Sequence, residues 1–164
     1  MASSTLQNFE QLSYGAPNLS IHRAKATQVI GDAVATRTLT ARESGATCQF
    51  DAAAGVVYTL PPPVIGMEFE FVTTVSVTSG SHKIITDAST TFLLGAVHMF
   101  TIATASTAGF SFNGTTHLAC TSNGSTTGGL VGSRVKVRAL SATQWFIEAN
   151  MVGSGVIVTP AATS

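Results

Sequence analysis

Charged side chains are scarce in this sequence. Lysine and arginine together number eight, aspartate and glutamate together number eight, and all four make up 10% of the 164 residues, against roughly a quarter in an ordinary soluble domain. Proteins that bind nucleic acid carry a clear basic excess, so a formal net charge of zero argues against that class. With so little charge repulsion, the chain favours an assembly that covers its faces.

Cysteine is also rare, at two residues. Cys48 and Cys120 could form one disulfide, but neither their spacing nor the start of the chain supports it, so we expect two buried free thiols. The first residues, MASSTLQNFEQL, lack the basic segment and apolar core of a secretory signal. We therefore expect synthesis and assembly in a cytoplasm.

Long apolar runs are limited to one candidate. No Asp, Glu, Lys or Arg occurs from Ala88 to Ser133, and the stretch 92–110 is apolar enough to be considered as a membrane span. His98 and several Thr and Ser residues interrupt it, and its Thr and aromatic content suits buried strands. We expect strands there and no membrane contact.

Motifs of catalysis and metal binding are missing. The sequence contains no G-x-S-x-G, Gly-Lys-Ser/Thr or G-x-G-x-x-G pattern, and its four histidines form no metal-binding pair. We expect no enzymatic activity, cofactor, metal or small-molecule substrate. One alternative stays open: Glu68 and Glu70, two apart on a strand, lie about 7 Å apart, as glycosidase carboxylates do. Because such pairs usually come from different elements, a solvent face is the favoured interpretation.

Short β patterns and hydroxyl side chains are abundant, with 41 Ser and Thr residues. From Thr38 onward, strand-like runs alternate with turn signals at intervals of about 8 to 12 residues, which is typical of a sandwich or barrel. Asn113-Gly114 is the strongest hairpin signal, and no helical stripe is present. The sequence predicts an all-β fold: an antiparallel, jelly-roll-like β-sandwich over residues 37–152. The expected strands are 38–40, 47–50, 56–60, 67–77, 82–86, 92–94, 99–103, 110–112, 116–121, 133–139 and 144–149.

The two ends differ from this domain. Residues 1–36 show no sustained period and are interpreted as an N-terminal arm, and residues 153–164 as a C-terminal tail. A disordered terminus is the alternative for the arm. Its apolar side chains favour docking on a neighbour, with Phe9, Leu12 and Tyr14 as candidate contacts.

The stretch SRVKVRAL is a charged strand, in which Arg134, Lys136 and Arg138 share one face and the apolar residues the other. These cations are candidate interface residues. They either protect a solvated edge strand or pair with acids, from Glu68 and Glu70 across the sheet or from a partner. Trp145 is expected in the core rather than as a sugar-stacking platform.

Three segments together resemble a known family. They are LTARESGATCQFDAAAGVVYTLPPPVIGMEFEF, HKIITDASTTFLLG and VKVRALSATQWFI. The chain resembles the small head decoration, or cement, proteins of tailed bacteriophages, particularly cyanobacterial phages. In that family a strand ends in Leu-Pro, here Leu60-Pro61, a Gly follows, here Gly66, and an F-x-F strand comes next. The clearest overlap covers residues 39–95 and the surroundings of Trp145.

The resemblance implies a structural virion protein. Such a subunit is a homotrimer on the outer surface of an icosahedral capsid, assembled in the host cytoplasm, whose partner is the major capsid protein. Two other functions stay open: a carbohydrate- or host-receptor-binding module of a phage fibre or spike, and a glycan hydrolase using Glu68 and Glu70.

Overall fold

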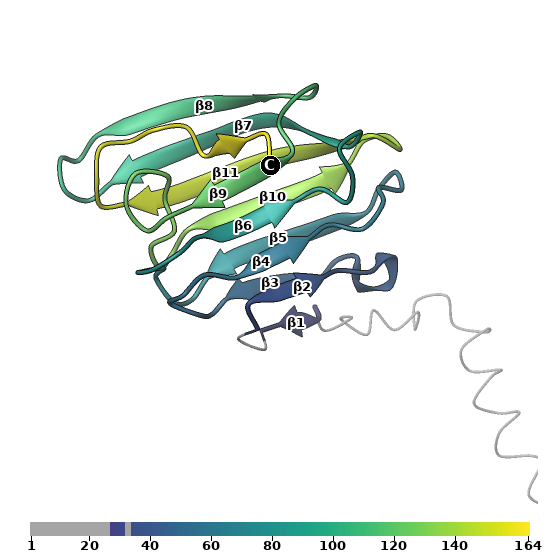
Figure 1. The fold of residues 1–164 in the computed structure, drawn as a ribbon, viewed down its shortest axis with the longest axis horizontal. Helices are drawn as coiled ribbons and strands as arrows, with labels where there is room; N and C mark the ends of the chain where they lie inside the picture. The colour runs from purple at the N-terminus through teal and green to yellow at the C-terminus, as the bar shows by residue number, and fades with distance from the viewer. Residues whose placement is uncertain (1–26, 32–33) are drawn as a thin grey trace, which may run out of the picture.

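The computed structural model describes residues 27–31 and 34–164, which form two β-sheets packed face to face (Figure 1). Of these described residues, 45% lie in strands and 2% in helix. The prediction of an all-β sandwich is therefore confirmed. The candidate arm contacts Phe9, Leu12 and Tyr14 lie outside the described residues.

The larger sheet has seven strands in the order β1-β3-β5-β10-β11-β7-β8. In chain order, these strands are β1 (Val29–Ile30), β3 (Thr47–Phe50), β5 (Glu68–Thr73), β7 (Phe92–Thr101), β8 (Thr107–Asn113), β10 (Arg134–Ala139) and β11 (Gln144–Gly153). The smaller sheet has five strands in the order β12-β9-β6-β4-β2. They are β2 (Thr36–Thr38), β4 (Val57–Thr59), β6 (His82–Ile85), β9 (Ala119–Ser122) and β12 (Ala161–Ala162). A single 3₁₀ turn, η2 (Ala41–Glu43), is the helical element of the described residues.

The pairing of the strands corrects one expectation, because both sheets are mixed rather than antiparallel. The pairs β1–β3, β3–β5, β2–β4, β4–β6 and β7–β11 are parallel. For the first four pairs the reason is the path of the chain: from β1 to β6, each connection crosses to the other sheet. Each crossing reverses the chain direction, so strands two apart in sequence become parallel neighbours. The β7–β11 pair joins strands that are four apart in chain order. The jelly-roll connectivity is not confirmed.

The turn at Asn113-Gly114 is also different from its prediction. It joins β8 of the larger sheet to β9 of the smaller one, so it closes no hairpin. Its chemistry is that of a tight turn nonetheless: the Asn113 Oδ1 accepts hydrogen bonds from the backbone N–H groups of Thr115 and Thr116, both at 3.0 Å. Gly114 has a φ of +72°, a value that glycine adopts without strain.

The core lies between the two sheets and is aromatic. Trp145 and Tyr58 are fully buried, with Phe69 6.0 Å from the Trp145 ring and Phe71 5.4 Å from the Tyr58 ring. The placement of Trp145 in the core is confirmed. So are the buried free thiols: burial raises the pKa values of Cys48 and Cys120 to about 12.

The sheets extend past the expected domain boundaries. β1, from the expected arm, pairs with β3, and β12, from the expected tail, pairs with β9. The apolar stretch 92–110 forms β7 and most of β8. Among the described residues there is no helix with the length and apolar character needed to cross a membrane.

Candidate interaction surface on the larger sheet

The outward side of the larger sheet gathers most of the charged side chains of the central strands. Side chains alternate along each strand, so Phe69 and Phe71 of β5 enter the core while the glutamates between them point outward. β10 and β11 alternate in the same way. We call the resulting surface the charged face; its members are Glu68, Glu70, Arg134, Lys136, Arg138 and Glu148.

The three predicted interface cations are brought together with the two glutamates of β5. In the register of β10 and β5, Lys136 lies opposite Glu70 and Arg138 opposite Glu68. The Arg134 Nε pairs with the Glu70 Oε1. The Lys136 Nζ lies 3.5 Å, and an Arg138 terminal nitrogen 3.1 Å, from the Glu68 Oε2. The interpretation that the cations pair with acids across the sheet is confirmed.

The alternative interpretation of β10 as an edge strand is wrong. β10 lies between β5 and β11 and is hydrogen-bonded to both. Because its backbone groups are already paired, its charges do not serve to block edge association. They form instead a positive row between acidic neighbours.

The ion pairs influence the chemistry of Glu68. The hydrogen bond from Arg138, followed by the charges of Lys136 and Arg138, holds the pKa of Glu68 below its usual value, although partial burial opposes this. A glycosidase acid must be protonated near neutral pH and therefore needs a raised pKa. The lowered pKa of Glu68 therefore does not suit the role of the general acid.

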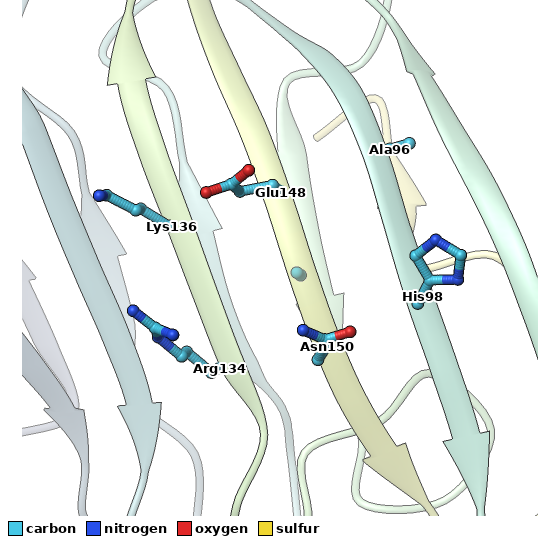
Figure 2. Close-up of a pocket in the computed structure, with 7 residues that line it drawn as sticks. Ala96, His98, Arg134, Lys136, Glu148 and Asn150 are labelled. Carbon is cyan, nitrogen blue, oxygen red and sulfur yellow. The ribbon is translucent and has the colours of Figure 1, made fainter.

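A shallow depression of about 300 Å³ continues the charged face across β11 and β7, and Figure 2 shows its lining. The side chains of Arg134 and Lys136 lean toward β5, away from Glu148. Glu148 has no ion pair within the described part of the chain. Asn150 and His98 lie opposite one another in the register and complete the far side. This half of the surface offers a carboxylate and neutral polar groups.

Exposed apolar side chains flank the charged face at one end, and we call them the apolar rim: Val64, Ile65, Leu140 and Phe146. The Gly66 N–H donates to the Ala139 carbonyl at 3.1 Å, which holds the loop after the three prolines beside Leu140. Leu140 and Phe146 also line a second depression of about 340 Å³. The sequence indicates a stiff loop at Pro61–Pro63, which suits an assembled contact, but the four side chains of the rim were not among the predicted interface residues.

The described residues contain no group of three or more His, Cys, Asp or Glu side chains that could hold a metal ion. The surface is open and shallow, carries both signs of charge and adjoins apolar groups, so its chemistry suits contact with another macromolecule. The fold and this surface together define a mixed-sheet β-sandwich with a candidate protein-binding face. No protein-family model, curated protein or solved structure matches the chain.

Proposed function

We propose that the chain is a structural virion protein: a head decoration, or cement, protein that binds the exterior of an icosahedral phage capsid as a homotrimer and stabilises contacts between major capsid subunits. The observation that carries the proposal is the charged face with its apolar rim. It is an extended surface on hydrogen-bonded central strands, which hold its side chains in fixed positions.

The composition of this surface suits a protein partner. Apolar groups such as Ile65, which is 75% exposed, gain free energy when a partner covers them. Arg138 and Glu68 already form an ion pair, so covering them with a partner costs less desolvation free energy than covering unpaired charges. Such charges also fix the orientation of the contact. Three attachment points per trimer would then multiply a modest affinity for each subunit.

The carbohydrate-binding alternative has less support. Sugar-binding β faces use exposed aromatic rings as platforms, whereas Trp145 is fully buried. Phe146 is 38% exposed and lies beside Arg138 in the sheet register, and Phe100 is 41% exposed and lies near the end of β7. Binding of the purified protein on a glycan array would favour this alternative.

The first experiment measures the mass of the protein in solution by light scattering after size exclusion. The chain weighs 16.8 kDa, so a trimer weighs about 50 kDa. Co-sedimentation with empty heads assembled from the major capsid protein of the same genome then tests attachment. A monomer that does not sediment with the heads would refute the proposal.

Two matched variants locate the contact. Ile65→Asp places a charge on the apolar rim, and Val156→Asp makes the same change at a site that is 81% exposed and outside the rim. Attachment should weaken about tenfold or more for Ile65→Asp, equivalent to about 1.4 kcal/mol, and stay unchanged for Val156→Asp. Equal attachment of both variants would exclude the rim. Deletion of residues 1–26, which keeps β1, tests the arm separately.

A further inference from the structure

The strand β8 is an unusual sheet edge. The other strands at the ends of the two sheets, β1, β2 and β12, have only two or three residues each. Short edges are one way in which proteins prevent unwanted pairing. β8 has seven residues, TAGFSFN, and contains no charge and no proline. In Figure 1 it runs along the outer border of the larger sheet. It therefore lacks the usual protections of an edge strand.

The hydrogen bonds on either side of β8 show which of its backbone groups are open. The Thr101 N–H donates to the Ser106 carbonyl, and the Gly114 N–H to the Leu93 carbonyl. Bonded and non-bonded pairs alternate along an antiparallel ladder. From these two bonds, the N–H and C=O groups that point away from β7 belong to Thr107, Gly109, Ser111 and Asn113.

Three of these residues are available. Asn113 is engaged, because its N–H donates to the His117 Nδ1. Thr107, Gly109 and Ser111 are exposed, and their backbone groups have no hydrogen-bond partner in the part of the chain that the structure describes. β12 lies close to β8 but pairs with β9 of the other sheet. A row of three open residues, centred on Gly109, thus remains.

We propose that two copies of the chain pair through their β8 edges, antiparallel, around a two-fold axis at Gly109. In this register Gly109 faces its own copy and Thr107 faces Ser111 of the partner subunit, so every open group finds a partner. Between these pairs, Phe110 lies beside the partner's Ala108, a large residue next to a small one.

A second copy fits this edge better than another partner because the edge is complementary to itself. Alternate antiparallel registers leave at least one of the three open residues without an equivalent partner. No like charges meet in the paired arrangement, because β8 carries none. The contact would join neighbouring subunits, whether or not they are attached to a capsid, and it does not depend on the proposed function.

Cross-linking tests the register. In the full-length protein, Gly109→Cys places two thiols on a bonded pair with Cα atoms about 5.5 Å apart, within the range of a disulfide. Ser111→Cys is the matched control. Its two Cα atoms would be separated by four residues along the strands, about 13 Å, which is too far to bridge. A Cβ at Gly109 meets no atom within 4 Å, so the substitution leaves the subunit intact.

Under mild oxidation, Gly109→Cys should form a covalent dimer, and Ser111→Cys should remain at the level of the natural chain, whose Cys48 and Cys120 are buried. A dimer of both variants, or of neither, overturns the proposed register.

A charged side chain at position 109 tests the association without a disulfide cross-link. Gly109→Lys sets two like charges directly opposite one another, and Thr38→Lys adds the same charge to the exposed edge of the other sheet. If the edges pair, the mass of the natural chain in light scattering should rise with concentration. Gly109→Lys should abolish this rise, and Thr38→Lys should retain it. An unchanged rise in Gly109→Lys overturns the pairing. The proposed trimer and its attachment to heads are measured separately. Loss of β8 pairing is therefore distinguishable from failure of the proposed function.

Discussion

Acidification should destabilise this protein through one buried histidine. His82 of β6 is 0% exposed, and its ring stacks on Phe50 of β3 at 4.5 Å, so it connects the two sheets. The Val56 N–H donates to the His82 Nδ1, and the His82 Nε2 lies 3.1 Å from the Val75 carbonyl oxygen. A backbone N–H can only donate and a carbonyl can only accept. The ring is therefore neutral, with its proton on Nε2.

The sign of the pH effect follows from this arrangement. Burial lowers the pKa of His82 below its ordinary value of 6.5, although the Val75 bond and the negative charge of Asp51 oppose the shift. Protonation of Nδ1 would also break the bond from Val56. Below pH 6.5 the His82 side chain binds a proton in the unfolded chain but stays neutral in the folded chain. The free energy of unfolding then falls by up to about 1.4 kcal/mol per pH unit until the folded-state pKa is reached.

The carboxylates act in a separate pH window. The pKa values of Glu43 and Glu68 are lowered from 4.5 in the folded state, so the stability that they contribute is complete above pH 4.5 and is lost as the pH falls through the lowered values. The interval from pH 6.5 to pH 5 therefore isolates the histidine contribution.

Urea denaturation followed by the fluorescence of Trp145, the single tryptophan, measures the effect at a fixed chain concentration. His82→Gln should be less stable than the natural chain at pH 7, with a flatter dependence on pH below 6.5. His98→Gln, at an exposed site on β7, should keep the natural slope. Parallel curves for His82→Gln and the natural chain between pH 7 and pH 5 would refute the reasoning.

Four further substitutions test the packing and the charged face. Gly95→Ala should destabilise the fold by about 2 kcal/mol or more in urea titrations, because Gly95 has a φ of +146° and its Cβ would collide with the Ile147 carbonyl oxygen. Gly109→Ala, in open space, should stay within about 0.5 kcal/mol, and equal effects of the two would contradict the geometry. Glu68→Gln should cost less than about 1 kcal/mol, and less still in high salt, because its ion pairs are solvent-exposed; a larger, salt-independent loss would show that they are not screened. Trp145→Ala should lose about 3 to 5 kcal/mol in thermal or urea unfolding, and a loss under 1 kcal/mol would exclude its central place in the core.

The sequence predicted which side chains of a strand face the core better than it predicted which strands pair with one another. Alternation placed Phe69 and Phe71 inside and Glu68 and Glu70 outside, because a strand has a period of two. That period does not say which strand lies alongside or in which direction. The pairing of the β10 cations with Glu68 and Glu70 was thus one of two open interpretations, and the central position of β10 was not foreseen.

Glycine and asparagine misled the sequence reasoning in two places. The sequence predicted separate strands at 92–94 and 99–103, but one strand, β7, continues through Gly95, whose unusual φ is accommodated without a break. Asn113-Gly114 indicated a tight turn correctly, yet a local signal cannot distinguish a hairpin from a crossing between sheets. Both errors concern long-range pairing, which local propensity does not encode.

The strand order also sets the timing of folding during synthesis. The middle of the larger sheet is formed by β10 and β11, which come late in the chain, and they separate β5 from β7. A nascent chain that ends before residue 134 can assemble neither the centre of that sheet nor the site for β7. Such non-local pairing folds slowly and leaves apolar strands exposed in the meantime. The chain must therefore leave the ribosome as far as the end of β11, at Gly153, before the sandwich can close.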